Sequence, residues 1–317
     1  MSETNRPLVV VAIGGNATYP PDIKGTAEEQ FAIIERSCRH LVDMVEAGWR
    51  LVITHGNGPV VGNILFRMAR TAAELQPMPM DVCVSHSQGG IGYMIQQSLV
   101  NALKLRGHGF PVASVVTQVE VDPADPAFGR PTKPVGKYFA RGEAERIARE
   151  TGWTFAEDGA KGWRRVVASP EPRRIVELDV VRRMVEEHVI PIACGGGGIP
   201  VVRRKDGGWT GVPAVIDKDM TSALLAGRLG ADALLILTGV EKVALDFAKP
   251  SQRDLDVMTA AEARRYLADG QFPEGNMGPK VRAALRYLDE DGKTAVITSL
   301  EHGRDALDGK AGTRVLS

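Results

Sequence analysis

The 317-residue sequence lacks both an excess of charge of either sign and a long hydrophobic run. Its 39 lysines and arginines are balanced by 39 aspartates and glutamates, so no global field attracts the chain to nucleic acid or to an anionic membrane. No apolar run approaches the roughly 20 residues that span a bilayer. The first apolar run, at 8–13, is too short for a signal peptide and ends in glycine. We therefore predict a cytoplasmic protein that binds neither nucleic acid nor membrane.

Cysteine is scarce, and several common site motifs are missing. Cys38, Cys83 and Cys194 are odd in number and widely spaced, which predicts neither a disulfide framework nor a zinc site. The chain has no G-x-x-x-x-G-K-[ST] phosphate loop. The turn Gly14-Gly15-Asn16 is not a G-x-G-x-x-G dinucleotide fingerprint, which argues against a hydride-transfer enzyme.

Two histidines, His55 and His86, follow apolar runs and are candidates for catalysis. Neither an H-E-x-x-H motif nor a serine–histidine–aspartate pattern accompanies them. We therefore expect a structural role for both.

The sequence repeats one succession of segments several times: an apolar run, then a glycine-rich turn, then a helical pattern. This order predicts an α/β fold, in which helices cover both faces of a mainly parallel sheet. Helices are expected at 28–47 and in segments that end at 105 and 187. Strands are expected at 8–13, 50–54, 82–84, 112–117, 174–178, 189–194, 233–238, 242–245, 294–298 and near 315, with a hairpin over 201–212.

Glycine-containing turns follow five of the expected strands. Glycine lets a backbone approach a ligand closely and expose N–H groups, which an anion needs. Because ligands of such sheets bind at the carboxyl ends of the strands, these turns are expected to gather around one site. They are Gly14-Gly15-Asn16, Gly56-Asn57-Gly58, Gly89-Gly90, the run from Gly195 to Gly198, and Gly239.

Two lysines stand at expected helix starts, where a cation is unfavourable. Lys218 opens a helical pattern for which Asp217 or Asp219 is a suitable N-cap, and Lys280 follows Pro279, the expected first residue of a later helix. A helix N-terminus carries about half a positive charge, so it attracts an anion. A single lysine is most often a solvated surface residue. The repetition beside glycine and aspartate instead predicts a phosphate site.

Residues 120–172 differ in composition from the rest of the chain. Prolines and charges are frequent there, and Phe139, Trp153, Phe155 and Trp163 supply an apolar core that a linker would not carry. We predict an inserted lid that closes over the site and excludes water. The alternative is an insert that serves only dimerisation or solubility.

Several segments together resemble the carbamate kinases, which have the amino-acid-kinase fold. The resemblance covers nearly the whole chain. The segments are Gly14-Gly15-Asn16-Ala17, His55-Gly56-Asn57-Gly58-Pro59, Ser87-Gln88-Gly89-Gly90-Ile91-Gly92-Tyr93, Pro131-Thr132-Lys133-Pro134-Val135-Gly136, Gly162-Trp163-Arg164-Arg165-Val166-Val167, Ala193-Cys194-Gly195-Gly196-Gly197-Gly198-Ile199-Pro200, Val215-Ile216-Asp217-Lys218-Asp219 and Met277-Gly278-Pro279-Lys280.

This resemblance implies a three-layer α/β/α sandwich, a homodimer and a role in arginine metabolism. It implies one amino-acid-kinase domain over 1–317, with a carbamate and phosphate lobe at about 1–190, a nucleotide lobe at about 191–317 and the lid at about 120–172. The implied reaction is reversible phosphoryl transfer between ATP and carbamate, giving ADP and carbamoyl phosphate. Mg²⁺ would be held mainly by the nucleotide phosphates, without a dedicated metal site.

The resemblance also implies residue roles. Lys218 and Lys280 would neutralise the transferring phosphoryl group, Asp217 would hold and orient both lysines, and Lys133 would reach in from the lid. Carbamate is already an anionic nucleophile, so a site of lysines and backbone amides needs no strong base. Phosphate and carbamate would be bound by Gly14, Gly15, Asn16, Gly56, Asn57 and Gly58, and the nucleotide by Gly195, Gly196, Thr238, Gly239, Met277 and Gly278.

The chain departs from the family pattern at two places. Thr238-Gly239-Val240 stands where most relatives read Thr-Asp-Val, and Gly136-Lys137-Tyr138-Phe139 stands where they usually read Gly-Pro-Phe-Tyr. These departures leave open a same-fold kinase for another small carboxylate or phosphate. A third possibility is a ligand-binding regulator without turnover, although such a protein would not need both lysines.

The substitution Gly239→Asp tests on which side of the site this turn lies. If Gly239 replaces an aspartate that contacts the nucleotide, the substitution should change the KM for ATP or ADP and leave that for carbamoyl phosphate nearly unchanged. Steady-state kinetics with each substrate varied separately would measure this. A change confined to the KM for carbamoyl phosphate would place the turn on the carbamate side of the site.

Overall fold

The computed structural model describes residues 6–20, 23–273 and 275–317. Its centre is strand β1 (Leu8–Ile13), an unbroken aliphatic run that is buried on both faces. Leu8, Val10 and Ala12 enter one core cluster and the alternate residues enter the other, as the two-residue period of a strand requires. The sequence prediction for this strand is confirmed.

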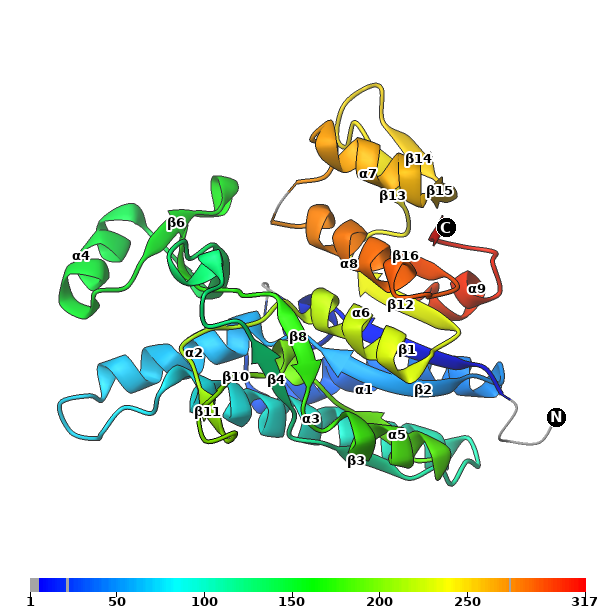
Figure 1. Cartoon of the computed structure of the whole chain (residues 1–317), viewed down its shortest axis with the longest axis horizontal. Coiled ribbons are helices and arrows are strands. Elements are labelled where there is room, and N and C mark those ends of the chain that lie inside the picture. The colour runs from blue at the N-terminus through cyan, green and yellow to red at the C-terminus, as the bar shows by residue number, and fades with distance from the viewer. Residues whose placement is uncertain (1–5, 21–22, 274) are drawn as a thin grey trace.

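An eight-stranded sheet extends from β1 on both sides (Figure 1). Its order is β15-β17-β16-β12-β1-β2-β9-β3, and its neighbouring strands pair in parallel apart from β16 and β17, which are antiparallel. The other strands are β2 (Arg50–His55), β3 (Val112–Ser114), β9 (Ile190–Ile192), β12 (Ala233–Thr238), β15 (Val257–Thr259), β16 (Ala295–Ser299) and β17 (Thr313–Leu316). The predicted α/β class with a mainly parallel sheet is confirmed.

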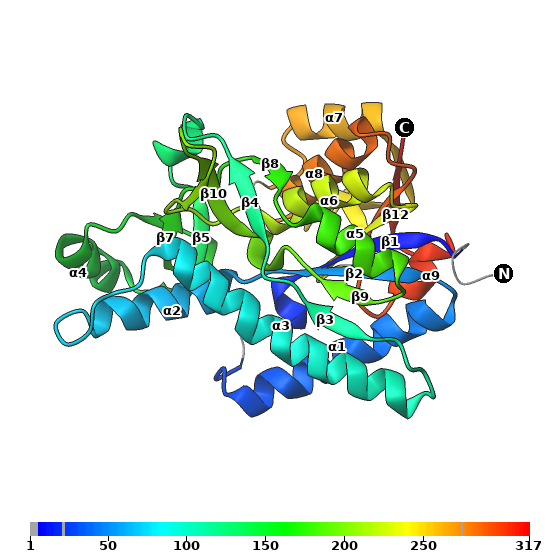
Figure 2. The same ribbon diagram turned by 60° about the horizontal axis from the view of Figure 1, so that its bottom comes forward.

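Helices cover both faces of this sheet, which gives three layers (Figures 1 and 2). One face packs against α5 (Leu178–Glu186), α6 (Lys218–Leu229), α7 (Ala260–Ala268) and α8 (Met277–Asp289). The other packs against α1 (Ala27–Glu46), α3 (Met80–Leu105) and α9 (Gly303–Leu307). Among the described residues, no helix is both long and apolar enough to cross a membrane.

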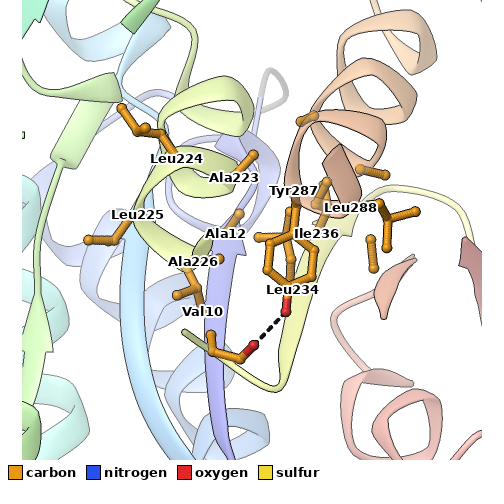
Figure 3. Close-up of a cluster of buried hydrophobic side chains, with 14 of the residues drawn as sticks. Val10, Ala12, Ala223, Leu224, Leu225, Ala226, Leu234, Ile236, Tyr287 and Leu288 are labelled. Atoms are coloured by element: carbon orange, nitrogen blue, oxygen red, sulfur yellow. Dashed lines mark hydrogen bonds between the residues drawn. The ribbon is translucent and has the colours of Figure 1, made fainter. Parts of the chain in front are cut away.

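Helices α6 and α8 are held together by a shared apolar core (Figure 3). Small and aliphatic residues of α6, such as Ala223 and Ala226, face the sheet, and Tyr287 of α8 is fully buried beside them. The Tyr287 hydroxyl donates a hydrogen bond of 2.6 Å to the backbone oxygen of Ala231, so its polar end is satisfied. This packing fixes the two helix N-termini relative to one another.

Smaller sheets lie outside the central sandwich. A four-stranded sheet has the order β11-β10-β4-β8, and β13 pairs with β14 in a hairpin. A three-stranded antiparallel sheet, β5-β7-β6, packs with α4 around an aromatic core and extends away from the sandwich (Figure 1). The bounds are β4 (Gln118–Val121), β5 (Lys133–Phe139), β6 (Phe155–Glu157), β7 (Trp163–Val167), β8 (Pro172–Ile175), β10 (Ile199–Arg203), β11 (Trp209–Gly211), β13 (Val243–Leu245), β14 (Arg253–Leu255) and α4 (Arg141–Thr151). Short 3-10 helices span Gly15–Ala17, Pro126–Phe128, Gly159–Lys161 and Gly195–Gly197.

Several sequence predictions of local structure were wrong or incomplete. Residues 82–84 form part of α3 rather than a strand, so Gly89 and Gly90 lie within a helix and not in a turn. The apolar residues of α3 continue at helical spacing, and their burial against the sheet offsets the roughly 1 kcal/mol that each helical glycine costs. Helix α2 (Gly58–Arg70) was not predicted, and α8 begins two residues before Pro279. The predicted strand at 112–117 is shorter, because the chain leaves the main sheet after β3.

The outer three-stranded sheet is anchored to α2 by two glycines. A Cβ on Gly62 would lie 2.0 Å from the backbone nitrogen and 2.1 Å from the Cα of Gly136. Gly136 also has a φ of +76°, which favours glycine. Only the absence of both side chains allows α2 and β5 to approach this closely. Lys133 begins β5, so this contact also determines where that lysine lies.

Gly62→Ala should therefore lower the free energy of unfolding by about 1 to 3 kcal/mol, because backbone atoms of β5 must move to admit the methyl group. Gly142→Ala in α4 is the matched control, since a Cβ there would meet no atom within 4 Å. That control should be neutral or stabilising by up to about 1 kcal/mol. Urea denaturation of both variants would measure the difference, and equal stabilities would show that the contact is not tight.

Candidate active site

The candidate site lies at the carboxyl edge of the central sheet, where β1, β2 and β12 end side by side. The turn after β1 packs against the end of β12, since a Cβ on Gly14 would lie 2.8 Å from the backbone oxygen of Leu237. The turn after β2 is hydrogen-bonded to β1 through the Gly56 amide and the Ile13 oxygen, at 3.1 Å. Adjacent parallel strands thus bring the predicted glycine turns together.

Helix α6 places Lys218 directly over the end of β1. Asp217 is the N-cap, and its Oδ1 accepts hydrogen bonds from the amides of Asp219 at 2.9 Å and Met220 at 3.3 Å. Lys218 is the first helical residue, and its Nζ donates a 3.2 Å hydrogen bond to the backbone oxygen of Ala12. This buried lysine is therefore held by a backbone group of β1.

Lys218, Asp219 and Lys280 form a buried ion cluster. The Nζ of Lys218 lies 2.6 Å from Oδ1 of Asp219, and the Nζ of Lys280 lies 3.2 Å from its Oδ2. The side chains of Lys218 and Asp219 are only 10% and 5% exposed. The Lys218 contact is close but not oriented as a hydrogen bond, so within the described structure Oδ1 accepts none. One carboxylate therefore bridges two lysines that come from different helices.

Burial and the neighbouring charges have opposite effects on the pKa values of this cluster. Burial lowers the pKa of the Lys218 ammonium, and Asp219 only partly opposes that effect. Asp219 raises the pKa of Lys280 despite burial. Burial opposes ionisation of Asp219, but the charges of Lys218 and Lys280 outweigh it and hold its pKa below the ordinary value. With three ions present the net charge is positive, which suits an anionic ligand.

Lys133 reaches the same edge from β5. Its Nζ donates a 2.7 Å hydrogen bond to Oδ2 of Asp217, and both side chains are about three-quarters buried or more. Burial opposes ionisation of Asp217, but the charge of Lys133 and its hydrogen bond bring the pKa well below the usual range. This ion pair links the outer three-stranded sheet to the start of α6.

The predicted contact between Asp217 and the two lysines was therefore assigned to the wrong aspartate. Asp217 caps α6 and pairs with Lys133, whereas Asp219 contacts Lys218 and Lys280. The reason is geometric, because an N-cap side chain turns back to its own helix amides. Asp219 was considered in the sequence only as a cap. Its place beside a lysine in the first turn, where α8 could approach, was the available signal.

The residues after β2 continue into α2 and are joined to α3 by a side-chain hydrogen bond. The Nδ2 of Asn57 donates a 2.8 Å hydrogen bond to the hydroxyl of Ser87, and Gly58 begins α2. His55 is buried, and burial lowers its pKa to about 4, so the ring is neutral at pH 7. His86 lies on the exposed side of α3 and not at a strand end. Neither ring supplies a cation to the site.

A cleft of about 180 Å³ opens between the glycine turn after β1 and the end of β12. We call it the β12 cleft. Thr238 and Gly239, which were predicted to bind the nucleotide, line it, and so does Asn276, just before α8, which was not among the predicted site residues. Met277 and Gly278 follow Asn276 as the first residues of α8. The full lining is Gly14, Gly15, Ala17, Leu237, Thr238, Gly239, Asn276, Lys280 and Leu300.

Gly195 and Gly196, which were grouped with these nucleotide residues, lie elsewhere. A Cβ on Gly195 would lie 2.4 Å from the His55 ring, and one on Gly196 would lie 2.1 Å from the Asn57 amide. They follow β9, which is beyond β2 in the sheet and therefore on the opposite side of β1 from β12. Gln88 holds this turn, because its Nε2 donates to the oxygen of Gly195 at 3.0 Å. The structure thus separates them from Thr238 and Gly239.

The described residues include no group of three or more histidine, cysteine, aspartate or glutamate side chains that could hold a metal ion. The two aspartates at the site are already paired with lysines. All three cysteines are free and buried, and burial raises the pKa of Cys38 to about 12.

Comparisons with known proteins give consistent similarities. The profile of the amino acid kinase family matches residues 7–299. The carbamate kinase of Thermococcus kodakarensis is 46% identical, covering 97% of this chain and 98% of its own. The structure of carbamate kinase from Giardia lamblia bound to citric acid has a TM-score of 0.94 and 39% identity over 99% of both chains. Its complex with AMP-PNP has a TM-score of 0.90 at the same identity and coverage.

Asp219→Asn should lower the free energy of unfolding by about 3 to 5 kcal/mol near pH 7, because it leaves two buried lysines without their shared counter-ion. Asp179→Asn is the matched control, since Asp179 is also the second residue of its helix but is exposed. That change should cost less than about 1 kcal/mol. Denaturant titrations would measure both.

The loss should depend on pH. The folded pKa of Asp219 is lowered, so its ion pairs stabilise the fold above the ordinary carboxyl pKa of about 4, and that contribution disappears as the pH falls through the lowered value. The gap between wild type and Asp219→Asn should therefore shrink below about pH 4. A gap that stays constant into acid would contradict the assignment.

Proposed function

The chain belongs to the amino acid kinase family, and from this membership we propose that it catalyses reversible phosphoryl transfer between carbamoyl phosphate and ADP, giving ATP and carbamate. The observation that carries the proposal is the ion cluster, in which Lys218 and Lys280 converge on Asp219 beside the glycine turn after β1. The high identity to a carbamate kinase over almost the entire chain supports the choice of substrate.

We propose that the nucleotide occupies the β12 cleft and that the carbamoyl group lies on the side of Gly56, Asn57 and Lys133. In the direction of ATP formation, an oxygen of the terminal phosphate of ADP attacks the phosphorus of carbamoyl phosphate. The bond between phosphorus and the carbamate oxygen breaks, and carbamate leaves as an anion. Both leaving group and nucleophile are anions, so no side chain has to accept a proton, and a neutral His55 is compatible with this.

The transferring group carries its charge on three oxygens, so positive groups that are already positioned lower the barrier. Lys218 and Lys280 approach from two different helices and are oriented by one carboxylate, which lets them contact different oxygens. Lys133 adds a third cation from β5 and is held by Asp217. Because this orientation exists before the substrate binds, little reorganisation is needed in the transition state.

Magnesium would come with the nucleotide as part of the substrate. Both aspartates at the site are already paired with lysines, so the nucleotide phosphates would supply its main ligands. We further propose a cytoplasmic homodimer with a role in arginine metabolism, as the family resemblance implies, and a lid formed by about residues 120–172, as their composition predicts. Sedimentation analysis of the purified chain would test the dimer.

The activity is tested by a coupled assay that follows ATP formation from carbamoyl phosphate and ADP with magnesium. Failure to form ATP would overturn the proposal and favour a related kinase with another small carboxylate or phosphate as substrate.

Lys218→Ala and Lys280→Ala should each reduce turnover by at least about a hundredfold, the scale of one lost transition-state donor. Lys205→Ala is the matched control, since Lys205 is exposed in the turn between β10 and β11. Circular dichroism should show that the variants remain folded. A variant with near-normal turnover would exclude that lysine from the mechanism.

A further inference from the structure

A second and wider cleft, of about 520 Å³, opens on the other side of the glycine turn from the β12 cleft. Four cationic side chains line it, and no carboxylate of the described residues does. We call it the cationic cleft, and its charged lining is Lys24, Lys137, Lys161 and Arg164. A cavity that is lined by cations and by no carboxylate raises the local concentration of anions.

The position of the cationic cleft makes it a route to the ion cluster. Gly15 lines both this cleft and the β12 cleft, so the two meet at the glycine turn. Pro59 and Asn63 of α2 form one wall, and Gly136 to Tyr138 of β5 form part of another. The same strand begins at Lys133, which contacts Asp217 at the start of α6.

Aromatic rings lie close to three of these cations. The Nζ of Lys137 lies 4.7 Å from the ring centre of Phe139 and 5.2 Å from that of Phe66. Lys161 and Arg164 lie 6.0 and 5.2 Å from the ring centre of Tyr138.

Carboxylates nearby only partly offset these charges. Lys137 has Glu143 at 3.8 Å, and Arg164 has Asp158 at 3.4 Å. The Lys137–Glu143 pair is substantially exposed, and such pairs contribute little in water. The Nε of Arg164 is buried and donates no hydrogen bond among the described residues, so this guanidinium keeps an unused donor beside the cleft.

We propose that the cationic cleft is the access route of the phosphate-bearing substrate, and that Lys137 and Lys161 draw this anion in by electrostatic attraction. The proposal rests on the proposed function and deepens it. A nucleotide in the β12 cleft would occupy that side of the glycine turn, so carbamoyl phosphate must reach the ion cluster from the other side. The cationic cleft is the opening that meets the turn there. The two lysines act on capture of the substrate and not on the chemical step.

The test is the salt dependence of kcat/KM for carbamoyl phosphate in the double variant Lys137→Gln/Lys161→Gln, measured in the full chain. At low ionic strength we expect kcat/KM to fall about three- to tenfold, with kcat and the KM for ADP within about twofold of wild type. At 0.5 M salt the difference should nearly vanish, because the Debye length is then well below the 10 Å found at 0.1 M.

The matched control is Lys104→Gln/Lys293→Gln, which also removes two positive charges. Lys104 lies in the last turn of α3, which leads to the start of β3, and Lys293 precedes β16, so both lie toward the opposite edge of the sheet. This control should leave kcat/KM unchanged at both salt concentrations.

Three results would overturn the proposal. An unchanged kcat/KM in the cleft variant would show that the route lies elsewhere. A loss that persists in 0.5 M salt would indicate direct contact in the bound complex instead of attraction. An equal loss for ADP would indicate a general effect of surface charge. Wild-type protein that makes no ATP would instead refute the proposed function itself, so the two failures are distinguishable.

Discussion

The buried contact of Lys218 and Lys280 with Asp219 is the interaction on which the rest of the site depends. Removing three charged groups from water is costly, and the cost is recovered only if they remain close together. Two lysines without Asp219 would repel each other, and Asp219 without them would favour its neutral form. The cluster is thus stable only when the N-termini of α6 and α8 are held at one distance.

The hydrophobic core supplies that constraint. Tyr287 and the small residues of α6 pack between the two helices and the sheet, so neither helix can slide without opening the core (Figure 3). The backbone oxygen of Ala12 then fixes Lys218 from below. Packing and electrostatics act together here: apolar burial sets the geometry, and the geometry makes the buried ions tolerable.

The same edge divides into two clefts that meet at Gly15. On one side the end of β12 and the residue before α8 form a small cleft, and on the other α2 and β5 form a wide one with a cationic lining. A site for transfer between two anions benefits from this division, because each anion can approach from its own side and meet the other at the lysines. The Lys133–Asp217 ion pair connects the outer three-stranded sheet to this meeting point.

Local patterns in the sequence were sufficient wherever one short-range rule decided the structure. Spacing and capping act between near neighbours, so the sequence was enough to predict four local features. These are the strand β1, the helix α1, the hairpin of β10 and β11, and Asp217 as one of two candidate caps for α6. Position at helix starts also made Lys218 and Lys280 stand out. The overall motif set was enough to indicate the family.

Tertiary structure decided what depends on residues far apart in the chain. The run at 82–84 became helix because the whole of α3 is buried on the sheet, which a three-residue window does not reveal. Gly195 and Gly196 face His55 and Asn57 because the strand order places β9 beside β2, away from β12. Asp219 bridges both lysines because α8 packs beside α6 and brings in Lys280, which lies 61 residues after Asp219 in the chain. Such contacts follow from how elements pack against one another, and the spacing of residues along the chain does not encode which helix will face which.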